Sequence, residues 1–277
     1  MYEEIQPFVK WIGSKRRVVD KLKEHLPVGY NPEEGSYYEP FVGSGAMMLA
    51  LRPANAVIND LNPELTLTYK VIRDNKEYQK MLNQLREWEK EHTEELYYKI
   101  RDMDRKPSYV SVEDYIHAAR LIYLNKTCYN GLYRTNRKGE FNAPCGHKEK
   151  VKLFDRKNLN AVHEYLSSND ITIFNGDYGE VIRSAKEGDF VYLDPPYDGT
   201  FNKYTAKSFG EKEQKKLGET FYVLANRGVN VMLTNSNTEL INSLYVSYNK
   251  KELKVRHIVS PKGESRKECT ELVITSY

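Results

Sequence analysis

The sequence predicts an α/β protein whose sheet is mainly parallel. Short apolar runs bounded by turn residues recur along the chain and are typical of buried strands, while the longer charged segments between them carry apolar residues at helical spacing. With 277 residues the chain is long enough for one large α/β domain and a smaller inserted or appended one. A glycine-containing loop joins the last two predicted strands, which adds an antiparallel hairpin to the sheet.

The elements follow in order along the chain. Residues 14–26 are predicted as a basic amphipathic helix that Pro27 ends. Strands at 36–42 and 56–60 start the sheet, a densely charged helical region extends from Pro63 to about 106, and a further helix spans roughly 111–126. An Asn- and Gly-rich basic loop then runs to about 150. The remaining predicted elements are strands at 171–174, 190–193 and 229–233, a helix at about 211–227, and strands at 252–259 and 270–276 around the loop 261–268.

The most informative segment is Asp194-Pro195-Pro196-Tyr197. It follows the apolar run 190–193, and its two prolines end the strand because they lack N–H donors. Ligands of open α/β sheets bind at this end of the strands. A carboxylate, a rigid carbonyl and an aromatic ring there suit methyl transfer to the exocyclic amine of a base: Asp194 and the Pro195 carbonyl would accept the amine hydrogens while Tyr197 stacks on the ring. The alternative is a loop that only ends a strand, with Tyr197 as its cap.

A second segment predicts the site of the methyl donor. Residues 36–46 are typical of a strand that runs into a turn with Gly43 and Gly45, followed by a helix. Asp60 ends the next strand, where the acceptor for ribose hydroxyls belongs in a nucleotide-binding βαβ unit. The third glycine of a pyrophosphate site is replaced by Met48. The pattern therefore favours S-adenosylmethionine and disfavours a dinucleotide-dependent oxidoreductase.

Taken together, these motifs resemble the Dam-type DNA adenine-N6 methyltransferases of the alpha group, the D12 class. The resemblance covers nearly the whole chain and rests on segments 8–15, 39–45, 59–60, 129–134, 139–144, 176–177 and 194–197. One position departs from the family: Ser14 stands where a second glycine usually precedes the lysine. The implied fold is an α/β, Rossmann-like S-adenosylmethionine-dependent methyltransferase sheet with a C-terminal antiparallel hairpin, interrupted by a mainly helical target-recognition domain. The implied domains are a catalytic domain in two parts, 1–65 and 166–277, and a target-recognition (DNA-binding) domain at 66–165.

The resemblance also implies roles for individual residues. The residues implied around S-adenosylmethionine are Trp11, Lys15, Phe41, Gly43, Gly45, Asp60 and Asp177, with Asp194 beside its methionine end. The implied catalytic turn is Asp194, Pro195, Pro196 and Tyr197. The implied DNA contacts are Lys10, Tyr129, Asn130, Leu132, Arg134, Asn136, Pro144 and Lys148.

Among the implied DNA contacts, Lys10 and Arg134 would read guanines, Arg134 through a bidentate pair in the major groove. Leu132 and Pro144 would contact a thymine methyl group, Tyr129 would fill the gap left by the flipped adenine, and Asn130 would steady the displaced partner strand. Lys148 falls where the family has a tyrosine that helps to read the outer guanine. The implied reaction is methylation of adenine N6 in GATC within double-stranded DNA, with S-adenosyl-L-homocysteine as the product and no metal.

Charge supports a nucleic-acid partner only locally. The net charge of the whole chain, +3, does not predict one. Residues 120–157, however, hold ten Lys and Arg against three Asp and Glu, a net +7, interleaved with Tyr123, Tyr129, Tyr133 and Phe141. Cations mixed with aromatic rings neutralise phosphates and stack on bases. The alternative is a solvated basic loop.

Other classes of protein are disfavoured. Cys128, Cys145 and Cys269 are far apart and odd in number, which favours reduced thiols, and Cys145-Gly146-His147 lacks the second ligand pair of a zinc site. The Pro-Cys-x-x-Cys of the zinc deaminases is absent. Without a signal-peptide pattern or a long apolar run, the chain is expected to be cytoplasmic, without a membrane partner, and of bacterial or phage origin. Three alternatives stay open: methylation of an RNA or nucleotide amine, a DNA target other than GATC, and a non-catalytic DNA-binding relative. A cognate restriction endonuclease encoded elsewhere is a candidate partner.

Overall fold

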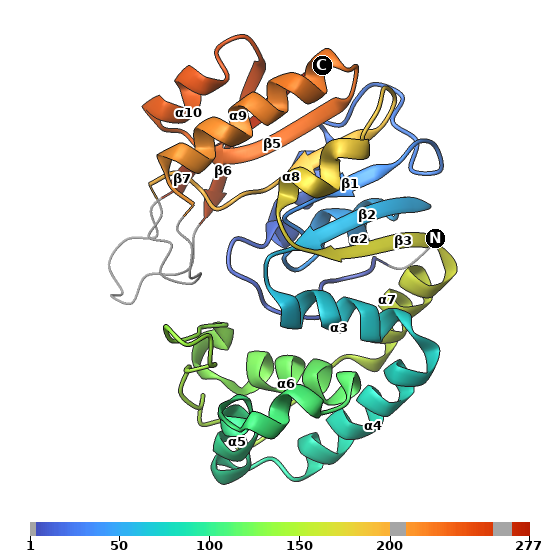
Figure 1. Cartoon of the computed structure of the whole chain (residues 1–277), viewed down its shortest axis with the longest axis vertical. Coiled ribbons are helices and arrows are strands. Elements are labelled where there is room, and N and C mark those ends of the chain that lie inside the picture. Colours follow the sequence, from blue (N-terminus) through green and yellow to red (C-terminus); the bar gives the residue numbers. More distant parts are fainter. Residues whose placement is uncertain (1–3, 200–208, 257–267) are drawn as a thin grey trace.

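The computed structural model describes residues 4–199, 209–256 and 268–277, and a seven-stranded sheet forms its centre (Figure 1). The strands are β1 (Tyr37–Glu39), β2 (Asn55–Asp60), β3 (Asp170–Asn175), β4 (Phe190–Leu193), β5 (Asn230–Ser236), β6 (Asn249–Arg256) and β7 (Glu268–Thr275). Their order is β3-β2-β1-β4-β5-β7-β6. The first five pair in parallel, whereas β7 is antiparallel to both β5 and β6. The predicted mixed α/β sheet with an antiparallel pair at its C-terminal end is confirmed; residues 257–259 of one predicted strand and 261–267 of the loop lie outside the described residues.

The alternation of side chains along the strands divides the interior into two cores. Tyr37, Phe190 and Tyr192 contribute to one core, while their neighbours Tyr38 and Val191 contribute to the other. Helices α1 (Val19–Lys23), α2 (Ala46–Leu51), α3 (Pro63–Arg73) and α7 (Arg156–Ser168) pack into the first core. Helices α8 (Tyr178–Val181), α9 (Glu211–Asn226) and α10 (Glu239–Leu244) pack into the second. Both faces of the sheet are therefore covered, as a parallel sheet requires.

The helical region predicted from Pro63 to about 106 is divided into three helices. These are α3, α4 (Asn75–Lys90) and α5 (Glu94–Arg101), followed by α6 (Asp114–Thr127). Asp74 ends α3 and caps α4, because its side chain accepts from the backbone N–H groups of Lys76 and Glu77. Thr93 caps α5 in the same way. Capping side chains that bond their own backbone break a continuous helical pattern, and apolar spacing alone does not show this.

Four helical segments differ from the sequence prediction. The helix predicted at 14–26 is reduced to a 3-10 turn, Lys15–Arg17, and α1, because Val18 leaves helical geometry at φ −123° and ψ 2°. Helices α7, α8 and α10 have no predicted counterpart. The N-terminus of α7 is capped by Asp155, whose side chain accepts from the backbone N–H of Asn158.

Helices α4, α5 and α6 form a helical layer that lies beside α3, beyond the β3 edge of the sheet (Figure 1). Its buried residues belong to the same core as α3. The fully buried Arg120 joins the two, since its guanidinium lies 3.1 Å from Glu64 on α3 and 2.6 Å from Asp104. The predicted domain boundary at residue 65 thus falls inside α3, and the division at 65 and 165 stays a prediction.

Candidate active site

The sheet order brings the two predicted motifs together. Strands β2 and β3 lie on one side of β1, whereas β4 and β5 lie on the other, so the strand order reverses between β1 and β4. These two strands are neighbours, and Tyr37 pairs with Phe190. At such a switch point the loops that follow the two strands diverge and leave a crevice for ligands. Here those loops are the glycine turn, residues 40–45, and the catalytic turn, residues 194–197. The side chain of Asn59, at the end of β2, donates to Pro40 O and Gly176 O, so the segment before Asp177 joins the same edge.

Asp194 is held through one of its two carboxylate oxygens. Lys15 Nζ lies 2.8 Å from Asp194 Oδ1, and Thr234 Oγ1 donates to the same oxygen at 2.6 Å. Within the described ranges no group donates to Asp194 Oδ2. Lys15 is itself buried, and its ammonium also donates to Gly13 O. The arrangement holds the carboxylate in place and leaves one oxygen without a donor among the described residues.

The rest of the catalytic turn is held by contacts with β7, α9 and Lys15. The Tyr197 hydroxyl donates to Glu271 Oε2 on β7 at 2.7 Å, and Lys15 Nζ lies 4.6 Å from the centre of the Tyr197 ring. The Pro196 carbonyl accepts a hydrogen bond from Gln214, while the Pro195 peptide follows Asp194 directly. Tyr197 is thus oriented at both its ring and its hydroxyl, as a stacking platform must be.

The glycine turn has the backbone geometry that requires glycine. Gly43 has φ +47° and Gly45 has φ +68°. A Cβ at Gly43 would lie 2.9 Å from Trp11 Cδ1, so the Trp11 ring covers this turn closely. Ser14 has an ordinary φ of −51°, and its hydroxyl pairs with that of Ser44 at 2.7 Å. The position that departs from the family pattern therefore imposes no strain on the loop.

Asp60, Phe41 and Asp177 stand around the same crevice. Asp60 accepts from the backbone N–H groups of Gly43 and Asn62, which fixes its carboxylate beside the glycine turn. Burial raises the pKa of Asp60 above its usual value, against the lowering effect of these hydrogen bonds. The Phe41 ring packs against Tyr178, at a centroid distance of 5.1 Å. Asp177 caps α8 through one oxygen, and its other oxygen lies 3.7 Å from Lys216 Nζ.

A buried acid that the sequence did not single out lies under the glycine turn. Glu39 ends β1, and its Oε2 accepts from the Tyr37 hydroxyl and from the backbone N–H of Met48. The pKa of Glu39 is raised to about 8, chiefly by burial and to a smaller extent by the charge of nearby Asp194, against the lowering effect of the two hydrogen bonds. At neutral pH most Glu39 side chains are therefore protonated.

The acids at this edge fit a cationic ligand better than a phosphate. Asp60, Asp177 and Asp194 follow β2, β3 and β4 respectively. A dinucleotide phosphate would be repelled by such a set, whereas a sulfonium with an ammonium group would be attracted. A glycine turn with an acidic residue at the end of the next strand is the pattern expected around the adenosine part of S-adenosylmethionine.

The recognition loop, residues 128–146, forms a narrow irregular hairpin at the end of α6. Its strands meet at two antiparallel bridges, Cys128 with Cys145 and Thr135 with Phe141. Both cysteines are buried free thiols, as predicted for reduced cysteines. Tyr129 and Pro144 are adjacent, since the Tyr129 N–H donates to Pro144 O.

The predicted DNA contacts in the recognition loop differ in exposure. Tyr129 is 59% exposed although aromatic, Asn130 and Pro144 are exposed, and Leu132 is half-buried. Asn130 adopts φ +57°, which turns the chain sharply near the base of the hairpin, just after Cys128. An exposed ring beside an exposed proline is available to a ligand, because neither packs into the core.

Arg134 and Asn136 have different surroundings. The guanidinium of Arg134 is held by Asn142, to which Nε donates at 2.8 Å and Nη2 at 3.0 Å. Its Nη1 has no partner in the described part of the chain, so the outer edge of the fork points away from these bonds. Asn136 is occupied in the turn itself, since it accepts from Lys138 N and Glu140 N and donates to the Glu140 carboxylate.

A cluster of four cations adjoins the recognition loop. Lys148 Nζ donates to the carbonyl of Lys126. The pKa of Lys126 is lowered to about 8, first by burial and then by the charges of Lys10, Arg16 and Lys148. Among the residues that the structure describes, Lys126 has no acidic partner. Cations collected without acids indicate a site for an anion such as a phosphate.

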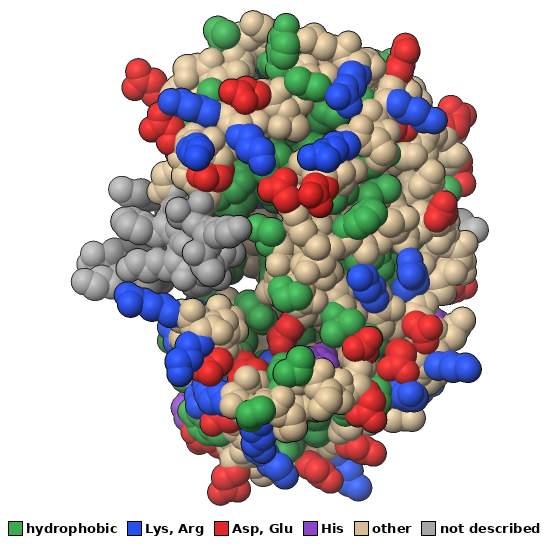
Figure 2. Space-filling model, viewed as in Figure 1, with side chains coloured by type: hydrophobic (Ala, Val, Ile, Leu, Met, Phe, Trp, Pro, Cys, Tyr) green, Lys and Arg blue, Asp and Glu red, His purple; other side chains and the backbone are tan. Residues whose placement is uncertain are grey.

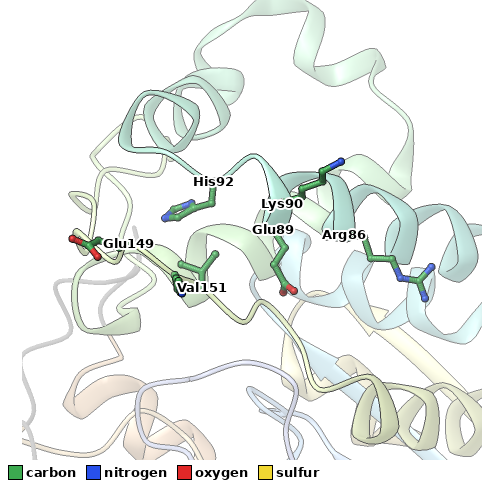
Figure 3. A pocket seen from close by; sticks show the side chains of 7 residues that line it. Arg86, Glu89, Lys90, His92, Glu149 and Val151 are labelled. Atoms are coloured by element: carbon green, nitrogen blue, oxygen red, sulfur yellow. The ribbon is translucent and has the colours of Figure 1, made fainter.

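Elsewhere on the described surface, the features that bear on function are patches of charge, hollows and groups of metal-binding side chains. On the face shown in Figure 2, Lys and Arg side chains are interspersed with Asp and Glu. A hollow of about 430 Å³ on the helical layer has a rim of mixed charge, formed by Arg86, Glu89, Lys90, His92, Glu149, Lys150 and Val151 (Figure 3). Where the structure is described, no group of three or more His, Cys, Asp or Glu side chains is arranged to hold a metal ion. In the same ranges, no helix has the length and apolarity to span a membrane.

Several residues of the site were not predicted from the sequence. They are Thr234 and Glu271 in the catalytic turn's surroundings, Glu39 below the glycine turn, and Asn125, whose side chain bonds Lys10. Thr234, Glu271 and Glu39 are polar residues within apolar strand segments. Because a buried polar group needs a hydrogen-bond partner, this pattern could have marked them as site residues. Asn125 lies in an apolar stretch of α6 and gave the same signal.

Comparison with known proteins agrees with this geometry. The family model described as "D12 class N6 adenine-specific DNA methyltransferase" matches residues 11–259. The chain is 35% identical to the type II methyltransferase M1.LlaDCHI of Lactococcus lactis subsp. cremoris, over 99% of this chain and 96% of that protein. It is 35% identical to the type II methyltransferase M.MjaIII of Methanocaldococcus jannaschii, over 99% and 100% of the two chains. It is 30% identical to the DNA adenine methylase of Escherichia coli strain K12, over 96% and 93%. The chain belongs to the D12 class of N6 adenine-specific DNA methyltransferases, a family whose methyl donor is S-adenosylmethionine.

Proposed function

We propose that this enzyme methylates N6 of the adenine in GATC within double-stranded DNA. The observation that carries the proposal is the free Oδ2 of Asp194, beside a fixed Tyr197 ring and across the switch point from the glycine turn. This arrangement offers an acceptor for an amine hydrogen and a platform for a base within one crevice. Arg134, whose Nη1 has no partner among the described residues, supports the choice of a guanine-containing target.

The catalytic turn would act by positioning and by stabilising charge. A flipped adenine would stack on Tyr197, and its N6 hydrogens would be accepted by Asp194 Oδ2 and the Pro195 carbonyl. These bonds hold the hydrogens out of the ring plane, so the N6 lone pair is directed at the methyl group. Asp194 then stabilises the positive charge that develops on N6, and Lys15 with Thr234 keeps the carboxylate in place. Adenine extrusion costs a few kcal/mol, which the stacking and the hydrogen bonds would recover.

The methyl donor would lie across the glycine turn. S-adenosylmethionine supplies an electrophilic methyl group when bound, and leaves as S-adenosyl-L-homocysteine. Asp60 would accept hydrogen bonds from ribose hydroxyls, while Trp11 and Phe41 would line the apolar part of the site. The positive φ of Gly43 and Gly45 bends the chain sharply after β1, beside the proposed donor site. Asp177 would complete the site at the end of β3.

The recognition loop would read the target. Arg134 would form a bidentate pair of hydrogen bonds with a guanine. Lys10 and Lys148 would donate hydrogen bonds to the outer guanine. Leu132 and Pro144 would contact a thymine methyl group, Tyr129 would fill the gap left by the adenine, and Asn130 would steady the partner strand. Because the Asn136 side chain is used inside the turn, its proposed contribution is to hold the loop in shape near the duplex. The helical layer and this loop would together form the target-recognition domain, and a separately encoded restriction endonuclease is a proposed partner.

Sequencing of DNA modified by the purified enzyme tests the proposal. Plasmid DNA that lacks adenine methylation is incubated with S-adenosylmethionine and read by single-molecule sequencing. N6-methyladenine in GATC is the expected result. A different consensus would overturn the GATC assignment and leave DNA adenine methylation intact, whereas modification of RNA alone, in a parallel reaction, would overturn both.

A further inference from the structure

Lys10 and Trp11 lie where three segments of the chain meet. The Trp11 ring covers Gly43 in the glycine turn and packs against the Tyr133 ring in the recognition loop, at a centroid distance of 5.3 Å. The residue before it, Lys10, is exposed and belongs to the cation cluster. Through Lys10 and Trp11, the N-terminal loop therefore contacts both the glycine turn and the recognition loop.

Asn125 fixes the backbone of Lys10. This side chain is fully buried in the last turn of α6. Its Oδ1 accepts from Lys10 N at 2.8 Å, and its Nδ2 donates to Lys10 O at 2.7 Å. One amide thus satisfies both backbone polar groups of a residue 115 positions away in the sequence. Buried amides that lose such partners are costly, so this pairing defines where the Lys10 Cα lies relative to α6.

The same amide also holds the recognition loop. Asn125 Nδ2 donates to Gly131 O at 3.3 Å. Gly131 has φ +65°, and a Cβ there would lie 2.7 Å from Lys10 Cδ, so the stem of Lys10 passes directly over the Gly131 backbone. A single side chain therefore sets the spacing between Lys10 and the loop that carries Tyr129 and Arg134.

We infer that Asn125 is a positioning residue for base selectivity and acts through Lys10. The inference rests on the proposed role of Lys10 as a reader of a guanine. A lysine ammonium is a point charge on a flexible stem and has no directional fork of its own. Its preference for a base edge over a neighbouring phosphate then depends on where its Cα is anchored. Loss of the anchor leaves the charge near DNA, so affinity for any duplex is kept while discrimination at one base pair is lost.

The test compares selectivity profiles of four single variants and one double variant with that of the wild-type enzyme. Methylation rates, as kcat/KM, are measured on the target found by sequencing and on duplexes with one base pair changed at each position. Lys10→Met identifies the position that Lys10 reads. Asn125→Ala removes the anchor, and Gly131→Ala displaces the Lys10 stem from the other side. Thr127→Val is the matched control, because this buried hydroxyl of the same helix donates only to Tyr123 O within α6. Thermal unfolding and S-adenosylmethionine binding confirm that each variant is folded.

We expect Asn125→Ala and Gly131→Ala to change the selectivity profile in the same way. Asn125→Ala and Gly131→Ala each reduce discrimination about tenfold at the Lys10 position and leave the Arg134 position unchanged. In the Lys10→Met background, Asn125→Ala produces no further loss. The Thr127→Val profile matches the wild type.

Three outcomes would overturn the inference. Unchanged selectivity in folded Asn125→Ala, or an equal loss at every position, would show that Asn125 has no selective role. Additive effects of Asn125→Ala and Lys10→Met would show that it does not act through Lys10. A Lys10→Met profile without a position-specific change would remove the basis of the inference while DNA methylation stands. Failure of the proposed function itself is distinct, since the wild-type enzyme would then show no adenine methylation of DNA.

Discussion

Lys15 Nζ and Asp194 Oδ1 lie 2.8 Å apart and form an ion pair that joins the N-terminal loop to the catalytic turn. Lys15 was predicted from the family resemblance to surround the cofactor, and the structure gives it a direct contact with the catalytic carboxylate. Thr234 donates to the same oxygen, and no described group donates to Asp194 Oδ2. The two partners thus hold the Asp194 carboxylate in a fixed position between β5 and the N-terminal loop.

The first prediction concerns Asp194. Asp194→Ala should abolish methyl transfer, because it removes both the acceptor and the stabilising charge, while duplex affinity stays within about tenfold of wild type since phosphate contacts supply most of the binding. Tritium transfer and a gel-shift titration on one preparation measure the two effects. Asp194→Asn, which keeps the side-chain shape beside Lys15, controls for misfolding. Turnover above a few per cent of wild type would exclude Asp194 from the chemistry.

Asp60 provides a test of the cofactor site. Asp60→Ala should weaken S-adenosylmethionine binding by about 1–3 kcal/mol, the usual cost of removing a buried hydrogen-bond acceptor. Isothermal calorimetry measures the affinity directly. Asp20→Ala is the matched control, because the Asp20 side chain is 84% exposed. Equal affinities of both variants and the wild type would place the ribose contact elsewhere.

Arg134 should determine selectivity, whereas Lys150 should not. Arg134→Ala is expected to cost about 1–3 kcal/mol and to relax selectivity at one base pair, since Arg134 Nη1 has no partner among the described residues. The exposed Lys150 should contribute only charge, so Lys150→Ala should lower affinity evenly across sequences. Binding titrations on duplexes with single base-pair changes separate the two effects. An even loss for Arg134→Ala would assign it to a phosphate.

Glu39 should make stability depend on pH. Its pKa is raised from 4.5 to about 8 in the folded state, mainly by burial, so the folded protein holds a proton that the unfolded chain releases between these values. The free energy of unfolding should therefore fall as pH rises from 4.5 to 8 and level off above 8. Glu39→Gln, which can still accept from Tyr37 and Met48, should flatten this dependence.

Urea unfolding across this pH range measures the effect of Glu39. The exposed Glu33→Gln serves as the control for a lost charge. An identical pH dependence in Glu39→Gln and the wild type would mean that Glu39 does not titrate in this range.

Lys126 should make DNA affinity depend on pH. Its pKa is lowered to about 8, first by burial and then by Lys10, Arg16 and Lys148. If Lys126 faces a phosphate, affinity should be constant below pH 8 and decline above it as the free protein loses this proton. The sign for stability is opposite: the folded pKa lies below the unfolded value of 10.5, so stability should rise between 8 and 10.5. Duplex titrations on either side of pH 8, with Lys126→Met as comparison, measure the affinity; parallel profiles would refute the contact.

Local patterns in the sequence were enough for the main elements and for the two motifs of the crevice. The strand 190–193 and the turn that follows it were predicted at the residues where the structure has them, because prolines end a strand wherever it lies. Likewise Gly43 and Gly45 have the positive φ that glycine in a turn implies. The lengths of the helices were harder to predict. Asp74 and Thr93 divide the helical region that starts at Pro63 by capping contacts, which apolar spacing does not reveal.

Only the tertiary structure decided which residues meet. Asn125 and Lys10 are 115 positions apart, Thr234 and Asp194 are 40 apart, and Glu271 reaches Tyr197 from the antiparallel β7. These contacts depend on strand order and on the packing of α6 against the N-terminal loop, which result from burial of the whole core and leave no local signature. The sequence by itself thus determined the chemical groups of this enzyme and their order, while the fold determined their partners, because hydrogen bonds between distant segments form only once the intervening chain is packed.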